Sequence, residues 1–142
     1  MRNKKPLVAV ACLCERVLRE EDGTLSAIRI VDTYRLRTAD VPPGMTGAVS
    51  LTALIGVRSG DVEGKSEITL KLTTPSGREL GAPQSYPILL QGGESGANII
   101  VQMALPVTEL GLYRLDVTWK DELLTSIPFK LVSQTPPAPA ET

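Results

Sequence analysis

Apolar residues alternate with polar ones along most of this 142-residue chain, with a period of two that is typical of half-buried β-strands. About eight such runs are bounded by Gly, Pro, Asp or Ser, and no amphipathic helix lies between them. The runs are residues 7–17, 25–36, 47–58, 66–74, 85–91, 97–107, 112–119 and 123–132. They predict an all-β fold, an antiparallel two-sheet β-sandwich of immunoglobulin-like or Greek-key type with about eight strands.

Turn-forming residues separate the predicted strands. Asp22-Gly23 favours a tight hairpin, because glycine takes positive φ easily, and Asp121-Glu122 predicts the last hairpin. The polar, glycine-containing segment Ser59–Gly64 predicts a further hairpin that joins residues 47–58 to residues 66–74.

Proline marks three other segments. Thr74–Gly77 has Pro and Gly where a β-turn prefers them. Val41–Gly44 contains two prolines and a glycine, which predict a loop. Pro87 lies within residues 85–91 and cannot donate a ladder hydrogen bond, so this run is predicted to be an edge strand.

The length of the chain supports one domain. With 42% hydrophobic residues, it can bury one core and is too short for two ordinary domains. We assign residues 1–133 to the β-sandwich domain. Residues 134–142 are predicted to be a disordered tail, because Pro136, Pro137 and Pro139 deny them ladder hydrogen bonds.

The N-terminus begins with basic residues and an apolar stretch that ends at Cys12, as a lipoprotein-type leader does. Only about six residues separate Lys5 from Cys12, fewer than the ~7–15 of such a leader. We therefore predict a first β-strand here. Because no run reaches the ~18–20 apolar residues of a membrane span, we expect a soluble, cytoplasmic protein with no membrane partner.

Composition argues against several kinds of chemistry. The chain has no histidine, so it lacks the commonest general base and the commonest metal ligand. Its net charge of -1 provides no basic excess for phosphates, and one Trp, three Tyr and one Phe leave few rings to stack on bases. We expect no nucleic-acid partner, no cofactor and no enzymatic activity, and we assign no catalytic, cofactor-binding or metal-binding residue.

Cys12 and Cys14 are two residues apart in a predicted strand. Their side chains share a face but cannot form an ordinary disulfide. They resemble a Cys-x-Cys metal-ligand pair, but no histidine or second cysteine pair completes a tetrahedral site. We interpret them as small buried hydrophobic residues in a reducing compartment.

Two groups of acidic residues and one glycine-rich segment are candidates for functional sites. The first acidic group is Glu15, Glu20, Glu21 and Asp22. It gathers at a predicted hairpin, where solvated turn residues are a better interpretation than an acid/base pair. The second group, Asp61, Glu63 and Glu67, lacks the spacing of a calcium loop and indicates a charged hairpin rim. Gly92–Gly96 has neither the Gly-Lys-Ser/Thr nor the helix of a phosphate loop, so we predict a flexible connection.

Asp32 would point inward if residues 25–36 form one unbroken strand. Its apolar neighbours in the same register are Ile28, Ile30, Tyr34 and Leu36. A lone buried carboxylate is costly, so either a β-bulge near Val31–Thr33 turns Asp32 outward, or Asp32 accepts hydrogen bonds from backbone amides or from Arg16 or Arg35. Tyr34 and Leu36 keep the same alternation as Ile28 and Ile30, whereas a one-residue bulge would shift it. This favours the buried carboxylate.

Glu109–Val117 resembles a late strand of immunoglobulin-like sandwiches, in which a tyrosine near a corner hydrogen-bonds back to the backbone. Tyr113 has that place in this sequence. The resemblance implies an immunoglobulin-like architecture. It implies no extracellular role, because the two sheet-bridging cysteines are absent.

A second resemblance covers most of the chain, to about Val132. The residues that carry it are Cys14-Glu15, Asp22-Gly23, Ser26, Ile28, Ile30-Val31-Asp32, Gly111-Leu112-Tyr113 and Pro128. They resemble a functionally uncharacterised family of small bacterial β-sandwich proteins. The resemblance implies a fold, and the family has no assigned activity, cofactor or catalytic residue to transfer.

Two classes of function remain. The first is a non-enzymatic β-sandwich module that acts through protein–protein contacts, as a structural or partner-binding protein or by self-association, because exposed sheet edges can pair with another strand. The alternative is a module that binds carbohydrate or another small ligand. An exposed Trp119 or Tyr86 flanked by amides would favour the ligand-binding module, whereas buried rings would favour protein contacts.

Overall fold

The computed structural model describes residues 5–37, 47–107 and 109–134. These residues form an all-β fold, as the alternating pattern predicts. The described part of the chain contains no helix that could cross a membrane. The strands are β1 (Leu7–Arg19), β2 (Leu25–Ile30), β3 (Thr33–Arg37), β4 (Gly47–Thr73), β5 (Gln84–Val107), β6 (Gly111–Trp119) and β7 (Glu122–Gln134).

The strands belong to one connected sheet. Its hydrogen-bonded order is β2-β1-β4-β6-β7-β3, and β5 pairs with β4. β3 runs parallel to β7, while the other pairs are antiparallel. The described residues therefore form a mixed sheet of seven strands, which corrects the prediction of an antiparallel two-sheet sandwich with about eight strands.

The predicted hairpin at Ser59–Gly64 is wrong, because the chain bends there without leaving the sheet. β4 and β5 each join two of the predicted strands. At the bend Gly60 pairs with Gly93, and their φ angles are 59° and 63°. Glycine takes such angles without the steric cost of a Cβ, so the ladder continues with shifts in register. The predicted flexible connection Gly92–Gly96 is part of β5.

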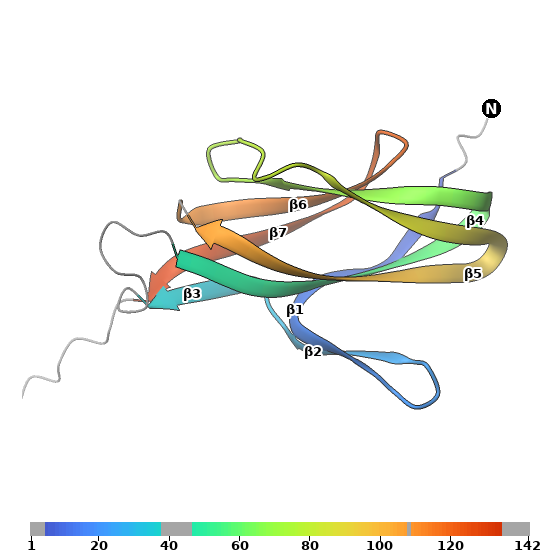
Figure 1. The fold of residues 1–142 in the computed structure, drawn as a ribbon, viewed down its shortest axis with the longest axis horizontal. Helices are drawn as coiled ribbons and strands as arrows, with labels where there is room; N and C mark the ends of the chain where they lie inside the picture. Colours follow the sequence, from blue (N-terminus) through green and yellow to red (C-terminus); the bar gives the residue numbers. More distant parts are fainter. Residues whose placement is uncertain (1–4, 38–46, 108, 135–142) are drawn as a thin grey trace, which may run out of the picture.

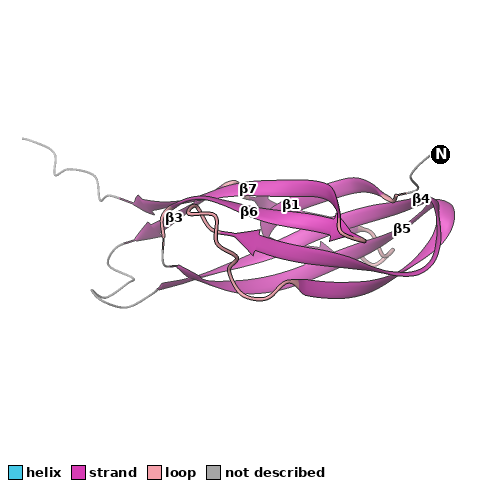
Figure 2. Cartoon of the chain, turned by 90° about the horizontal axis from the view of Figure 1, so that it is seen from above, coloured by secondary structure: helices cyan, strands magenta, loops and turns pink. Residues whose placement is uncertain are grey.

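The bent ribbon of β4 and β5 folds the sheet over on itself, as Figures 1 and 2 show. The first half of β4 pairs with β1 and with the second half of β5. The second half of β4 pairs with β6 and with the first half of β5. The sheet thus has two layers that face each other, and β5 lies at an edge of both layers.

The predicted strand at residues 25–36 is broken into β2 and β3 at Val31 and Asp32. The Val31 N–H donates to a β1 carbonyl, whereas the Asp32 carbonyl accepts from a β7 N–H. The chain therefore changes partners across these two residues. Asp32 is exposed, as are Arg16 and Arg35, so the buried-carboxylate interpretation is wrong. Because the strand is interrupted between β2 and β3, the alternation of inward and outward side chains does not continue unchanged from one strand to the other.

One cluster of buried apolar side chains fills the space between the layers. It includes Leu13 from β1, Ile55 from β4, Val101 from β5 and Leu131 from β7. Strands from both layers thus contribute to a single core, as expected for a one-domain chain of this size.

Tyr113 and Trp119 are buried, as their register predicts. The Tyr113 hydroxyl donates to the Glu109 carbonyl at 2.7 Å, which is the corner contact predicted from the sequence. Trp119 is 6% exposed, and its indole N–H donates to the Ser66 hydroxyl. Both polar aromatic groups have a partner inside the fold, so their burial leaves no donor unsatisfied.

The described turns agree with the sequence. Asp22-Gly23 connects β1 to β2, with Gly23 at φ 89°. In Thr74–Gly77 the last N–H donates to the first carbonyl at 2.9 Å. The β6–β7 hairpin turns at Lys120 and Asp121, both with positive φ, one residue before the predicted position.

Two predictions concern segments outside the described residues. These are the Val41–Gly44 loop and the tail from residue 135 onward. The predicted tail includes Gln134, but this residue pairs with Arg37 in the β3–β7 ladder. The last strand therefore extends one residue past the predicted domain boundary.

Candidate binding groove

The acidic residues of the first hairpin have the contacts of a solvated turn. Glu15, Glu20, Glu21 and Asp22 are all exposed. Asp22 accepts hydrogen bonds from the hydroxyl and the backbone N–H of Thr24, and these bonds lower the pKa of its carboxyl group. Glu15 pairs with Arg29 at 3.4 Å. Glu20 accepts a hydrogen bond from the Ser26 hydroxyl at 2.9 Å, so the described contacts of this group are those of a solvated hairpin.

The second acidic group lies at and after the bend in β4. Asp61, Glu63 and Glu67 are exposed. Asp61 and Glu63 line a hollow of about 680 Å³ together with Trp119 and Lys120, while Glu67 lies outside it. Within the three described ranges, no group of at least three His, Cys, Asp or Glu side chains is placed to hold a metal ion.

Cys12 and Cys14 are free thiols on the face of β1 opposite Leu13. Cys14 is buried and Cys12 is half-buried. Burial raises the pKa of both thiol groups. A thiol with a raised pKa stays protonated and unreactive, which agrees with their interpretation as small hydrophobic residues.

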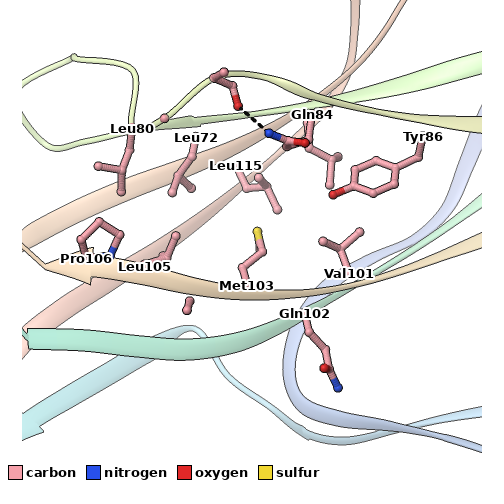
Figure 3. Close-up of a pocket in the computed structure, with 14 residues that line it drawn as sticks. Leu72, Leu80, Gln84, Tyr86, Val101, Gln102, Met103, Leu105, Pro106 and Leu115 are labelled. Atoms are coloured by element: carbon pink, nitrogen blue, oxygen red, sulfur yellow. Dashed lines mark hydrogen bonds between the residues drawn. The ribbon is translucent and has the colours of Figure 1, made fainter.

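An apolar groove of about 410 Å³ opens between the two layers, where β5 forms the edge of both. One wall consists of Leu72, Leu80 and Tyr86, and the facing wall consists of Val101, Met103 and Leu105 (Figure 3). The bend in β5 places its two halves on opposite sides of this space. None of the described residues that line the groove is charged, so it is suited to neutral, apolar groups.

Sequence reasoning did not find this groove. The phase of Met103 and Leu105 predicts core positions, and Leu80 stands alone between turn residues. Alternation shows that these side chains face inward, but not that the space before them stays open at the sheet edge. The edge strand predicted from Pro87 was the one available signal.

β5 presents a free edge beside the groove. Within the described part of the chain, this 24-residue strand pairs with β4 alone, which confirms the predicted edge position of Pro87. Natural sheet edges are commonly protected by charges or prolines. The segment Ala97–Leu105 contains neither. Among the described residues, no strand pairs with the outward backbone groups of this segment.

The two aromatic residues that distinguish the function classes have different environments. Trp119 belongs to the core. Tyr86 is half-buried at the groove, with Gln84 nearby, whose Nε2 donates to the Ala82 carbonyl at 3.4 Å. Gln102 points away from the groove (Figure 3). The burial of Trp119 thus favours the class of module that acts through protein contacts. Tyr86 offers one ring, with one nearby amide, to a ligand.

These features define a class of protein, an all-β module with a folded-over sheet, a tyrosine corner and an apolar groove at an open edge. Residues 9–132 match the family of unknown function DUF6941, and the chain belongs to that family. No curated protein matches the sequence.

Solved structures are similar in fold. The β-glucosidase from Listeria innocua in complex with glucose is 14% identical, with a TM-score of 0.50, over 91% of this chain and 16% of that chain. An immunoglobulin-like protein from Pseudomonas aeruginosa is 17% identical, with a TM-score of 0.45, over 89% of this chain and 96% of that chain. This chain spans about a sixth of the glucosidase, and at this identity the likeness shows the fold alone.

Proposed function

We propose that this protein is a non-enzymatic module that acts through protein–protein contacts, with the free edge of β5 as its contact surface. The observation that carries the proposal is the segment Ala97–Leu105, an edge without charge or proline. Backbone groups on such an edge hydrogen-bond readily to an extended strand of another chain. The lack of histidine supports a non-enzymatic role, because it removes the commonest general base.

Two matched lysine substitutions test the proposal. Ile100 on β5 and Leu112 on β6 are each 38% exposed. Leu112 pairs with Lys130 of β7, on a strand that does not pair with β5 in the described part of the chain. Lysine on an edge strand opposes strand pairing, so Ile100→Lys should abolish association, whereas Leu112→Lys should leave it intact. Sedimentation over a range of protein concentrations measures self-association, and affinity capture from an extract of the native host measures partner binding.

Circular dichroism of both variants shows whether they remain folded. Equal association of the two variants would contradict a contact at the β5 edge. Wild-type protein that neither associates with itself nor captures a host protein would contradict the proposed function as a whole.

The groove supports a second candidate function, the binding of carbohydrate or another small ligand. Its volume of about 410 Å³ lies within the roughly 300–1,000 Å³ of small-molecule sites. Tyr86 supplies a ring for stacking. A screen of neutral sugars and other small neutral molecules by thermal shift tests this candidate, with Tyr86→Ala expected to abolish any shift.

We also infer an immunoglobulin-like architecture and a location in the bacterial cytoplasm. The contact between Tyr113 and the Glu109 carbonyl supports the architecture. The free thiols of Cys12 and Cys14 support a reducing compartment. The sequence resemblance to a family of small bacterial sandwich proteins supports a bacterial origin.

A further inference from the structure

We infer that the groove selects the segment that pairs with β5, and that this segment is an extended, uncharged strand of a partner protein with apolar side chains at alternate positions. The inference rests on the proposed function, because pairing with the β5 edge is what brings the segment to the groove.

The alternation of β5 sets the alternation of its partner. Val101, Met103 and Leu105 line the groove, whereas Gln102 points away from it (Figure 3). Side chains of paired strands alternate between the same two faces of a sheet. Every second side chain of an added strand would therefore project over the groove, and the others would lie on the outer face beside Gln102 and Ile100.

The chemistry of the walls requires apolar groups at those positions. Leu80 and Tyr86 belong to the wall that faces Val101, Met103 and Leu105, and the described lining carries no charge. An ionised side chain placed there would lose its hydration without gaining a counter-ion, which is costly. The volume of about 410 Å³ far exceeds the roughly 30 Å³ that one water occupies, so the groove has room for more than one apolar side chain.

A second copy of this chain fits the groove less well than a segment without a core of its own. In β5 the inward side chains of Val101 and Leu105 are only 8% and 6% exposed, because they are packed in their own core. The inward side chains of β5 in a second copy are therefore not free to enter the groove.

The test uses a phage-displayed library of random linear peptides, selected on the full-length protein. We expect enriched peptides in which apolar residues alternate with others. Met103→Gln and Leu80→Gln alter the two facing walls without adding a charge to the β5 edge, and each should weaken binding of a synthesised peptide by about tenfold or more, since each places a polar group against an apolar one. Leu112→Gln on β6 is the matched control, since it makes a similar exchange outside the groove and the β5 edge, and it should bind as the wild type does. Circular dichroism establishes that each variant is folded.

Backbone N-methylation separates edge pairing from groove selection. Methyl groups on alternate peptide nitrogens should abolish binding in one of the two phases, because only one phase of N–H groups faces β5. If methylation abolishes binding but neither groove variant weakens it, edge pairing stands and groove selection is wrong. If methylation has no effect in either phase, the proposed function is overturned together with the inference.

Two further results would overturn the inference alone. The first is a selection that enriches no peptide with alternating apolar residues. The second is a wild-type dimer that Met103→Gln dissociates and Leu112→Gln does not, since the occupant of the groove would then be a second copy of the chain.

Discussion

Two tyrosines of the core differ in what their hydroxyl groups contact. Tyr113 donates to the Glu109 carbonyl, whereas the buried hydroxyl of Tyr34 has no hydrogen-bond partner among the described residues. Both rings pack on Phe129, Tyr113 in a stacked arrangement and Tyr34 edge-on. Burial raises the pKa of Tyr34 to about 12, and the nearby thiols of Cys14 and Cys12 contribute to the increase.

Tyr34→Phe should therefore change the dependence of stability on pH. As the pH rises from 10 to about 12, the unfolded chain releases the Tyr34 proton while the folded chain keeps it, so the folded state loses stability. The loss approaches an upper limit of about 2.7 kcal/mol for two pKa units, and Tyr34→Phe should remove it. Below pH 10 the substitution should be neutral or stabilising, because it deletes an unpaired buried hydroxyl.

Urea unfolding of both proteins across this pH range measures the effect. Tyr113, whose pKa burial also raises, is present in both proteins, so the difference between them isolates Tyr34. Parallel stability curves for wild type and variant would show that Tyr34 does not carry the effect.

Trp119→Ala should destabilise the fold by about 3–5 kcal/mol, the usual cost of deleting a large buried aromatic side chain. It removes a core ring and leaves the Ser66 hydroxyl without its indole partner. Lys120→Ala is the matched control, since the Lys120 ammonium lies 4.8 Å from the ring centroid and such a contact contributes only about 0.5–1 kcal/mol. Urea unfolding compares them, and native tryptophan emission typical of a solvated indole would contradict the buried position.

Asp32→Ala should change stability by no more than about 0.5 kcal/mol, the range of ordinary surface substitutions. The side chain is exposed, and the described contact of this residue with β7 uses its backbone carbonyl, which alanine retains. A loss of ~1–3 kcal/mol on urea unfolding is what a buried carboxylate with hydrogen-bonded donors would produce, and it would restore the interpretation made from the sequence.

Among the elements, the β4–β5 ribbon depends on glycine for two different reasons. Gly93 has a positive φ of 63°, and a Cβ there would meet nothing within 4 Å. A Cβ on Gly96 would lie 2.6 Å from the Val57 carbonyl oxygen of β4. Gly93 thus provides backbone conformation at the bend, while Gly96 allows close approach of the two strands.

These two glycines should respond differently to alanine. Gly93→Ala should cost roughly 1–2 kcal/mol, the strain of a left-handed backbone. Gly96→Ala should cost more, because the contact is with backbone and the strands must separate, and overpacking of this kind reaches about 1–3 kcal/mol and beyond. Urea unfolding ranks the two variants, and an equal or smaller loss for Gly96→Ala would mean that the strands separate at little cost.

For the whole molecule, one core holds both layers of the folded-over sheet together. β7 contributes Leu131 to this core, at 0% exposure, and its last residue, Gln134, pairs with Arg37 of β3. The residues that follow are rich in proline and lack a large apolar side chain, so they are not expected to contribute to the core.

Deletion of residues 135–142 should therefore leave the midpoint of thermal unfolding unchanged. The control deletion begins at Leu131 and removes a buried leucine together with part of the β3–β7 ladder; it should lower the midpoint by several degrees or prevent folding. Differential scanning calorimetry compares the two truncations. A lower midpoint for the shorter deletion would show that the tail packs against the domain.

The sequence by itself determined most of the residues that form strands, and which side chains of most strands face inward. Trp119 and Tyr113 are buried as their alternation predicts, and the Thr74–Gly77 turn forms as its proline and glycine predict. These features depend on neighbouring residues, because backbone angles and side-chain alternation are local properties.

Tertiary structure alone decided how strands continue and what they pair with. Glycines that predict a hairpin can equally carry a strand through a bend, so the pairing of Gly60 with Gly93 could not be predicted locally. Asp32 turns outward because the chain changes its pairing partner from β1 to β7 at that point. The alternation of apolar and polar residues along a sequence does not show where such a change of partner occurs. The groove exists because β5 is an edge of both layers, which is a property of the folded-over sheet and of no single segment.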